Sequence, residues 1–174
     1  MSVFTKKFFA KHDDYESPDY AWDQILPFIP KDKKIWEAFY GSGKSGKYLA
    51  GLGLDVVHED VDFFSNDIGD IIVSNPPFSK KKEVFSRLKE LDKPFIMICP
   101  SSMINTKYIR ELFAGKLQIL IPPKRNNFTK LVNGEVPAGW GNRCNFDCFY
   151  YCYKMNLEQD ITWLPKVCVS KPLG

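Results

Sequence analysis

The sequence lacks several features that would place it in a class of protein at once. It has no apolar run long enough to cross a membrane and no recognisable cleavage signal near its first residue, which favours a cytoplasmic protein. Its five cysteines are odd in number and lack the spacing of a disulfide framework, so we expect a reducing compartment. The formal net charge of +3 over 174 residues is too small to indicate a nucleic-acid-binding protein by itself.

The sequence also has few metal-binding side chains, with only two histidines, His12 and His58, far apart. Cys144, Cys148 and Cys152 are spaced four apart, which on a helix would place three thiols on one face. The aromatic segment 146–155 instead predicts a strand, which would spread them along its length. Since no further cysteine or histidine completes a site, we predict buried free thiols and no metal.

The residues that are present suit one folded domain spanning 1–174, since 44% are hydrophobic and 15% aromatic. Apolar segments with strand character alternate with segments of helical periodicity. Strands are expected within 33–41, 54–60, 69–78, 94–100, 116–123 and 146–155, and helices within 17–29, 44–53, 80–93 and 105–115. Ser17 is expected to cap the first helix, with Pro18 at its first position. This alternation predicts an α/β fold in which a mostly parallel, twisted sheet is covered by helices on both faces, with ligands bound at the carboxyl ends of the strands.

A glycine-rich stretch, 37–48, resembles a phosphate-binding loop at first sight. That loop requires G-x-x-x-x-G-K followed by serine or threonine. The frame that begins at Gly41 ends in Tyr48, which cannot replace the small hydroxyl, and the frame that ends in Ser45 begins at Ala38 instead of glycine. We therefore favour a different use of the glycines.

The alternative begins at Glu37, which follows a predicted strand. An acid and a glycine turn between a strand and a helix is one way in which such sheets bind adenosine-containing cofactors, because glycines let the backbone approach the ligand. Phe39, Gly41 and Gly43 complete this pattern. An ordinary strand-to-helix turn with a solvated glutamate fits the same letters.

The stretch DIIVSNPPF, 70–78, is more specific. It can be a strand followed by a rigid turn, but it also suits the methylation of an amine. An exocyclic amine on a base needs two hydrogen-bond acceptors, which the Asn75 side-chain oxygen and the Pro76 carbonyl can supply. Pro76 and Pro77 stiffen the turn because their φ angles are fixed, and Phe78 offers a flat face for stacking. Alignment of the reacting atoms would then provide most of the rate.

These residues resemble the amino-methyltransferases that use S-adenosylmethionine, in particular the N6-adenine DNA methyltransferases. Asn75, Pro76, Pro77 and Phe78 match the NPPF motif of that family, and Glu37, Phe39, Gly41 and Gly43 match its cofactor loop. The resemblance implies a Rossmann-like class I methyltransferase fold with an antiparallel C-terminal strand. It also implies an enzyme that binds S-adenosylmethionine and releases S-adenosylhomocysteine.

The same resemblance implies roles for further residues. Glu59 or Asp60 would hold the ribose hydroxyls, and Asp62 and Phe63 would hold the cofactor's adenine. The N-terminal segment 1–30 would close over the methionine end of the cofactor. Within it, Tyr15, Ser17 and Pro18 are the candidate contacts.

The substrate is expected to be nucleic acid, most simply DNA, whose target base must leave the duplex. Lys80, Lys81 and Lys82 follow Phe78 and would contact phosphates. The irregular stretch 122–145 is a second candidate for a substrate-facing loop. It contributes Lys124, Arg125, Phe128 and Trp140 as candidate contacts.

No segment is long enough for a separate target-recognition region, so a homodimer or a specificity partner is an open prediction. RNA adenine or guanine methyltransferases and protein glutamine methyltransferases share the Asn-Pro-Pro-aromatic motif and remain alternatives. A non-catalytic binding module of the same fold and a phosphate-loop enzyme are further alternatives.

Overall fold

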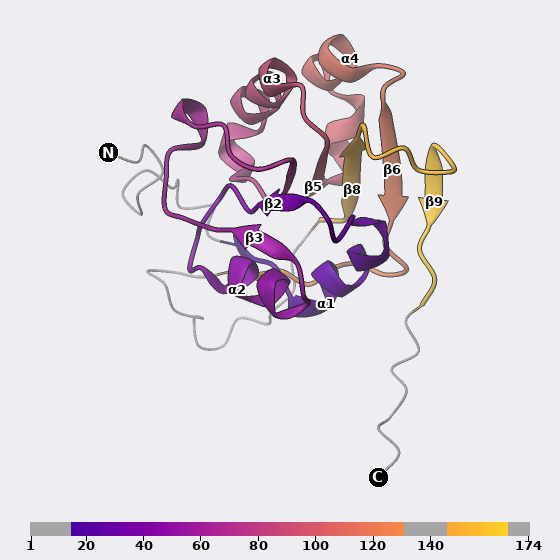
Figure 1. Ribbon diagram of the computed structural model, residues 1–174. Coiled ribbons are helices and arrows are strands. Elements are labelled where there is room, and N and C mark those ends of the chain that lie inside the picture. Colours follow the sequence, from indigo (N-terminus) through magenta and orange to yellow (C-terminus); the bar gives the residue numbers. More distant parts are fainter. Residues whose placement is uncertain (1–14, 131–145, 167–174) are drawn as a thin grey trace.

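The computed structural model describes residues 15–130 and 146–166, and within them the chain forms a seven-stranded sheet (Figure 1). The strand order is β3-β2-β4-β5-β8-β6-β9. In that order the strands span Asp55–Val57, Lys34–Trp36, Ile71–Ser74, Phe95–Pro100, Cys148–Tyr153, Leu117–Ile121 and Ile161–Trp163. Only β8 runs against its neighbours, pairing antiparallel with both β5 and β6, while all other pairs are parallel.

Helices cover both faces of this sheet. The α-helices are α1 (Asp19–Asp23), α2 (Lys44–Gly51), α3 (Lys81–Leu91) and α4 (Lys107–Phe113). Short 3₁₀ turns span Leu26–Phe28, Phe63–Ser65, Phe78–Lys80 and Ser101–Asn105. Figure 1 shows α1 and α2 on one side of the sheet and α3 and α4 on the other. None of the helices in the described ranges is long and apolar enough to cross a bilayer.

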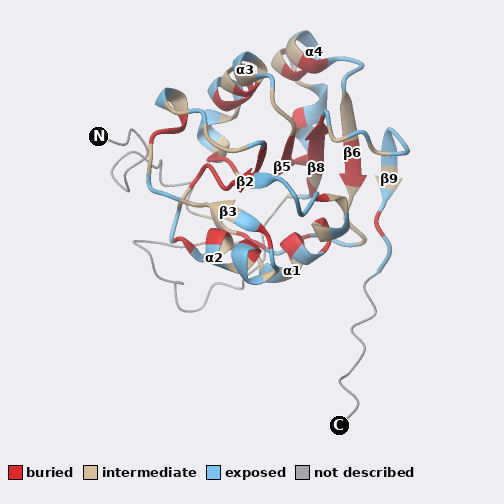
Figure 2. Cartoon of the chain, viewed as in Figure 1, coloured by how far each residue is buried: buried red, intermediate tan, exposed pale blue. Residues whose placement is uncertain are grey.

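The alternation of side chains along the strands produces an apolar layer on each face of the sheet. Figure 2 shows β5 and β8 coloured largely as buried. In β5, Ile96 and Ile98 pack with Trp22 of α1, in one cluster of buried side chains. Phe95 and Met97 of the same strand belong to the other cluster, with the residues of α3 and α4. A strand that is buried on both faces has no polar positions, which is why residues 95–100 form a continuous apolar run.

The expected mostly parallel sheet with helices on both faces is confirmed, and its arrangement is compatible with a Rossmann-like fold. β8 is the antiparallel strand near the end of the chain. β9 was not predicted, and neither was a separate two-stranded ladder in which β1 (Tyr15–Glu16) pairs antiparallel with β7 (Thr129–Lys130).

The predicted start of the first helix is wrong. Pro18 has extended backbone angles and is the N-cap residue, so α1 begins at Asp19 and has no side-chain cap. Ser17 lies outside the helix, and its hydroxyl contacts a distant residue instead.

The prediction of buried thiols is confirmed for the cysteines that the structure describes. Cys99, Cys148 and Cys152 are all buried, and burial raises the pKa of the Cys152 thiol to about 12. In the described ranges, no group of three or more candidate ligand side chains could hold a metal ion. Cys144 lies outside the described residues.

Candidate functional site

The candidate site lies where the direction of strand addition reverses. β2 pairs with β3 on one side and with β4 on the other, so the chain leaves β2 in one direction and later returns on the opposite side. In open α/β sheets, such a reversal leaves a crevice outside the carboxyl ends of the strands. Glu37 follows β2 and Asn75 follows β4, so both motifs found in the sequence meet at this edge.

Glu37 and Ser74, the last residue of β4, link the two motifs directly. The Ser74 hydroxyl donates a short hydrogen bond to Glu37 Oε1, and the Phe39 backbone N–H donates to the same oxygen at 3.4 Å. Glu37 is only 2% exposed. Burial raises the pKa of its carboxyl to about 8, although both hydrogen bonds act in the opposite direction. The raised pKa favours the protonated, neutral carboxyl at neutral pH.

The glycine loop after Glu37 requires glycine at two positions. Gly41 and Gly43 have φ angles of 57° and 82°, in the left-handed region that other residues avoid. Gly43 is also the N-cap of α2, and a Cβ there would lie 2.8 Å from the Tyr40 hydroxyl. The loop consequently brings bare backbone to the carboxyl edge of the sheet, beside Glu37.

The side chain of Asn75 is held at one end only. Its Nδ2 donates to the Ser17 hydroxyl at 3.0 Å. Its Oδ1 is buried and has no hydrogen-bond partner among the described residues. Pro76 and Pro77 are buried. The Pro77 carbonyl accepts a hydrogen bond from the Lys80 N–H at 3.0 Å. The Pro76 carbonyl is therefore the better candidate for the second acceptor of a substrate amine. A buried amide oxygen without a partner is costly unless a ligand completes it.

Phe78 belongs to a group of four rings that we call the aromatic cluster: Tyr15, Phe78, Phe128 and Phe146. The centroid of Phe78 lies 5.7 Å from that of Tyr15, 6.2 Å from that of Phe128 and 5.1 Å from that of Phe146. These residues come from β1, from the turn after β4 and from the two flanks of segment 131–145. The cluster therefore joins the N-terminal segment and both flanks to the NPPF turn, a junction that the sequence did not reveal.

The acids that follow β3 differ in whether their carboxylates are available to a ligand. Glu59 and Asp60 are exposed and open to a ligand. Asp62 caps the following 3₁₀ turn, where its carboxylate accepts from the Phe64 N–H at 3.1 Å and from the Ser65 hydroxyl at 2.6 Å.

The prediction that the Phe63 ring covers an adenine is wrong for this structure. Phe63 is fully buried, with its centroid 5.5 Å from that of Trp36 and 4.9 Å from that of Phe39. Phe39 is itself only 7% exposed, so its side chain is part of the core. Phe64, the next residue, is the partly exposed ring at this position.

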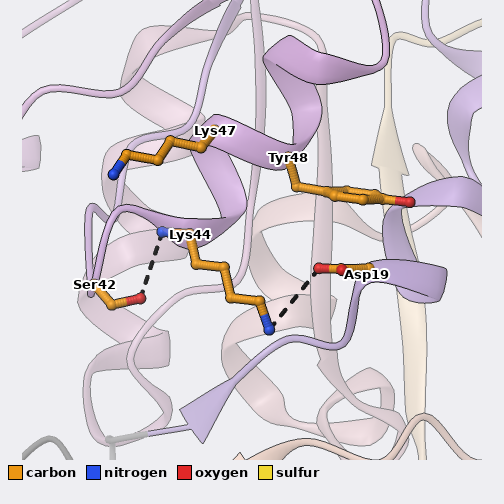
Figure 3. Close-up of a pocket in the computed structure, with 5 residues that line it drawn as sticks. All are labelled: Asp19, Ser42, Lys44, Lys47 and Tyr48. Atoms are coloured by element: carbon orange, nitrogen blue, oxygen red, sulfur yellow. Dashed lines mark hydrogen bonds and ion pairs between the residues drawn. The ribbon is translucent and has the colours of Figure 1, made fainter.

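An open pocket of about 440 Å³ lies beside the glycine loop (Figure 3). Its lining comprises Asp19, Ser42, Lys44, Lys47 and Tyr48. Figure 3 shows Lys44 reaching toward Asp19, at 3.9 Å, while Lys47 extends the other way. Lys44 also pairs with Glu16 at 2.9 Å, and this bond raises the pKa of its ammonium group. The segment 15–19 and the glycine loop are thus held together by charge.

The predicted nucleic-acid contacts divide into two groups. Lys80 and Lys82 are exposed at the start of α3, and Lys81 Nζ lies 6.0 Å from the centroid of the Phe78 ring. This group therefore adjoins the NPPF turn and remains available for phosphate contacts.

The group after β6 is largely engaged within the protein. Arg125 pairs with Asp147, with Nε 2.8 Å from Oδ1, and this pair lowers the pKa of the Asp147 carboxyl. Lys124 Nζ lies 5.8 Å from the centroid of the Tyr20 ring. Phe128 is 1% exposed, so its predicted stacking on a base is wrong. Trp140 lies outside the described residues.

Compared with models of known protein families and with curated protein sequences, the chain matches none.

Proposed function

We propose that this protein is a class I methyltransferase that transfers a methyl group from S-adenosylmethionine to the exocyclic amine of a nucleic-acid base, N6 of adenine in DNA. The observation that carries the proposal is the buried Asn75 Oδ1, which has no partner in the described ranges. It lies at the end of β4, next to the strand that carries Glu37. An amine that donates one N–H to this oxygen and the other to the Pro76 carbonyl would complete the turn.

The fold supports this proposal because the strand order reverses at β2, where an adenosine-containing cofactor would bind. The antiparallel β8 between β5 and β6 agrees with what the resemblance to class I methyltransferases implies. The alternative of a phosphate-loop enzyme is less favoured, because Lys44 is already paired with Glu16 and Asp19.

The residues of the glycine loop fit S-adenosylmethionine. Gly41 leaves space for a ligand next to the backbone, whereas the space beside Gly43 is taken by the Tyr40 side chain. Glu37 is a buried acid suited to a cationic or hydroxyl-bearing group. Exposed Glu59 and Asp60 are available to ribose hydroxyls. When bound, the cofactor supplies an activated methyl group.

The chain's own residues then act by binding and orientation. Asn75 and Pro76 each accept one N–H of the amine, which directs the nitrogen lone pair toward the cofactor site. The methyl carbon would exchange its bond to the cofactor's sulfur for a bond to this nitrogen, which would leave S-adenosylhomocysteine, and the nitrogen would lose one proton to solvent. No strong general base is needed, so the rate depends mainly on alignment.

The test is methyl transfer from a labelled cofactor to duplex DNA, single-stranded DNA, RNA and protein, followed by nucleoside and amino-acid analysis. We expect label in N6-methyladenine of DNA. Asn75→Ala should reduce transfer by at least about a hundredfold, as for the loss of an essential hydrogen bond at a reacting group. Its affinity for the cofactor, measured by calorimetry, should stay unchanged.

Gln159→Ala provides the control, since this exposed amide lies before β9, at the far end of the sheet, and should leave transfer unchanged. Label found only in RNA or only in a protein glutamine would overturn DNA as the substrate. Absence of label from every substrate would overturn methyl transfer itself.

A further inference from the structure

Ser17 lies between β1 and α1, and its contact crosses 58 residues of sequence. The side chain is 3% exposed, and its hydroxyl accepts the hydrogen bond from Asn75 Nδ2 at 3.0 Å. The resemblance to the methyltransferases implies that Ser17 contacts the methionine end of the cofactor. The contact made in the structure is with the amide of the NPPF turn.

An amide side chain has a donor end and an acceptor end, so its orientation decides which one meets a ligand. With Nδ2 bound to Ser17, Asn75 presents Oδ1. After a half-turn, Nδ2 would face the substrate amine, and two donors would oppose each other. We infer that Ser17 is a positioning residue that keeps the Asn75 oxygen directed at the substrate amine, an inference that rests on the proposed function.

Several contacts keep Ser17 in place. The preceding residues pair with β7 in the register Tyr15↔Lys130 and Glu16↔Thr129. Glu16 is bound by Lys44 at 2.9 Å, and the Tyr15 ring contacts that of Phe78. The hydroxyl therefore belongs to a braced segment, which makes it suitable for fixing another side chain.

Removal of the hydroxyl should slow turnover without weakening cofactor binding. We expect Ser17→Ala to lower kcat by about ten- to a hundredfold, the range expected for a misplaced reacting group. The KM and Kd for S-adenosylmethionine should not change. Ser17→Thr keeps a hydroxyl and should restore most of the rate. The matched control is Ser86→Ala on α3, whose hydroxyl donates to the Lys82 carbonyl.

A second measurement does not require activity. The side-chain amide signals of Asn75, identified in a nitrogen-15 spectrum by their loss in Asn75→Ala, should exchange slowly with water in the wild-type protein. Ser17→Ala should accelerate this exchange and Ser86→Ala should not.

The outcomes separate the two proposals. If the wild-type protein labels no substrate, the proposed function fails and the role of Ser17 fails with it. If the wild-type protein is active and Ser17→Ala retains full kcat, only the role of Ser17 is overturned. A raised Kd for the cofactor with unchanged kcat would likewise overturn the positioning role and would indicate that Ser17 contacts the cofactor.

Discussion

Strands β2 and β4 lie in the same sheet as β5 and β8, yet the two pairs differ in what they bury. β2 and β4 are three and four residues long, and they are followed directly by Glu37 and Asn75, both of which carry polar atoms away from water. β5 and β8 are six residues long and pair along their whole length. The Tyr151 hydroxyl of β8 donates to the Pro100 carbonyl at 2.7 Å.

This difference indicates a division of roles within one sheet. Buried polar atoms that lack full hydrogen bonding lower stability, but they are also what a ligand can complete. The apolar pair β5–β8 stabilises the fold through aromatic packing, and the β2–β4 edge can then hold reactive groups.

The largest effect on stability is expected from a cavity in the β5–β8 pair. Phe95 in β5 is fully buried, and its ring contacts Phe85, Phe113 and Tyr153. Phe95→Ala should lower the free energy of unfolding by about 3–5 kcal/mol, measured by urea denaturation. Phe149→Ala in β8 removes a partly exposed ring and should cost clearly less. Equal losses would contradict the view that the buried aromatic packing around Phe95 stabilises the β5–β8 pair.

A pH-dependent effect on stability is expected at the β2–β4 edge, where Glu37 is buried. Because the folded protein holds the Glu37 pKa near 8, well above the ordinary 4.5, it binds more protons than the unfolded chain between these values. Stability contributed by neutral Glu37 is therefore complete below pH 4.5 and is lost as pH rises toward 8, by up to about 1 kcal/mol per pH unit. Unfolding of the wild type and Glu37→Gln across pH 5–8 measures the difference.

Exposed Glu83 provides the comparison, since Glu83→Gln should keep the wild-type pH slope. The same slope in Glu37→Gln and in the wild-type protein would show that Glu37 titrates normally.

A smaller effect is expected at the glycine loop. Gly43→Ala places a side chain at φ 82° and against Tyr40, so it should cost about 1–3 kcal/mol. Cofactor affinity measured by calorimetry should fall as well. Gly51→Ala, at a helical position with nothing near the new Cβ, should be neutral or slightly stabilising. A loss of stability without any loss of cofactor affinity would separate the loop from the cofactor site.

The smallest effect is expected for the exposed ion pair. The side chains of Arg125 and Asp147 are 46% and 59% exposed, so solvent screens their attraction. Arg125→Ala should change the free energy of unfolding by less than about 1 kcal/mol, and 1 M salt should remove the difference. A larger loss that does not depend on salt would indicate that the ion pair stabilises other parts of the fold as well as the flanks of segment 131–145.

Local patterns predicted the main elements and the meeting of the two motifs. Val84, Phe85 and Leu88 have helical spacing and are all buried in α3, and the apolar run 94–100 became the central strand β5. Parallel strands place their carboxyl ends at one edge, so Glu37 and Asn75 could be expected together.

Contacts between distant segments could not be predicted in this way. Ser17 has the letters of a helix cap, but its hydroxyl bonds to Asn75, and no local pattern distinguishes these uses. Phe63 was expected at the cofactor from the resemblance, and Phe128 at the substrate from its place in the stretch 122–145. Both rings are buried, because neither a motif nor an irregular stretch shows which aromatic side chains pack into the core. β9 was missed because it has three residues, none fully buried, and Trp163 is 75% exposed.

The aromatic cluster has a consequence for how this chain can vary. Phe128 and Phe146 stack with their centroids 5.8 Å apart, although segment 131–145 separates them in the sequence. Both rings also contact Phe78, so a change in the size of one ring would disturb the packing of the other two. Substitutions at these three positions should therefore be tolerated only in combination, which couples the flanks of segment 131–145 to the turn that holds Asn75.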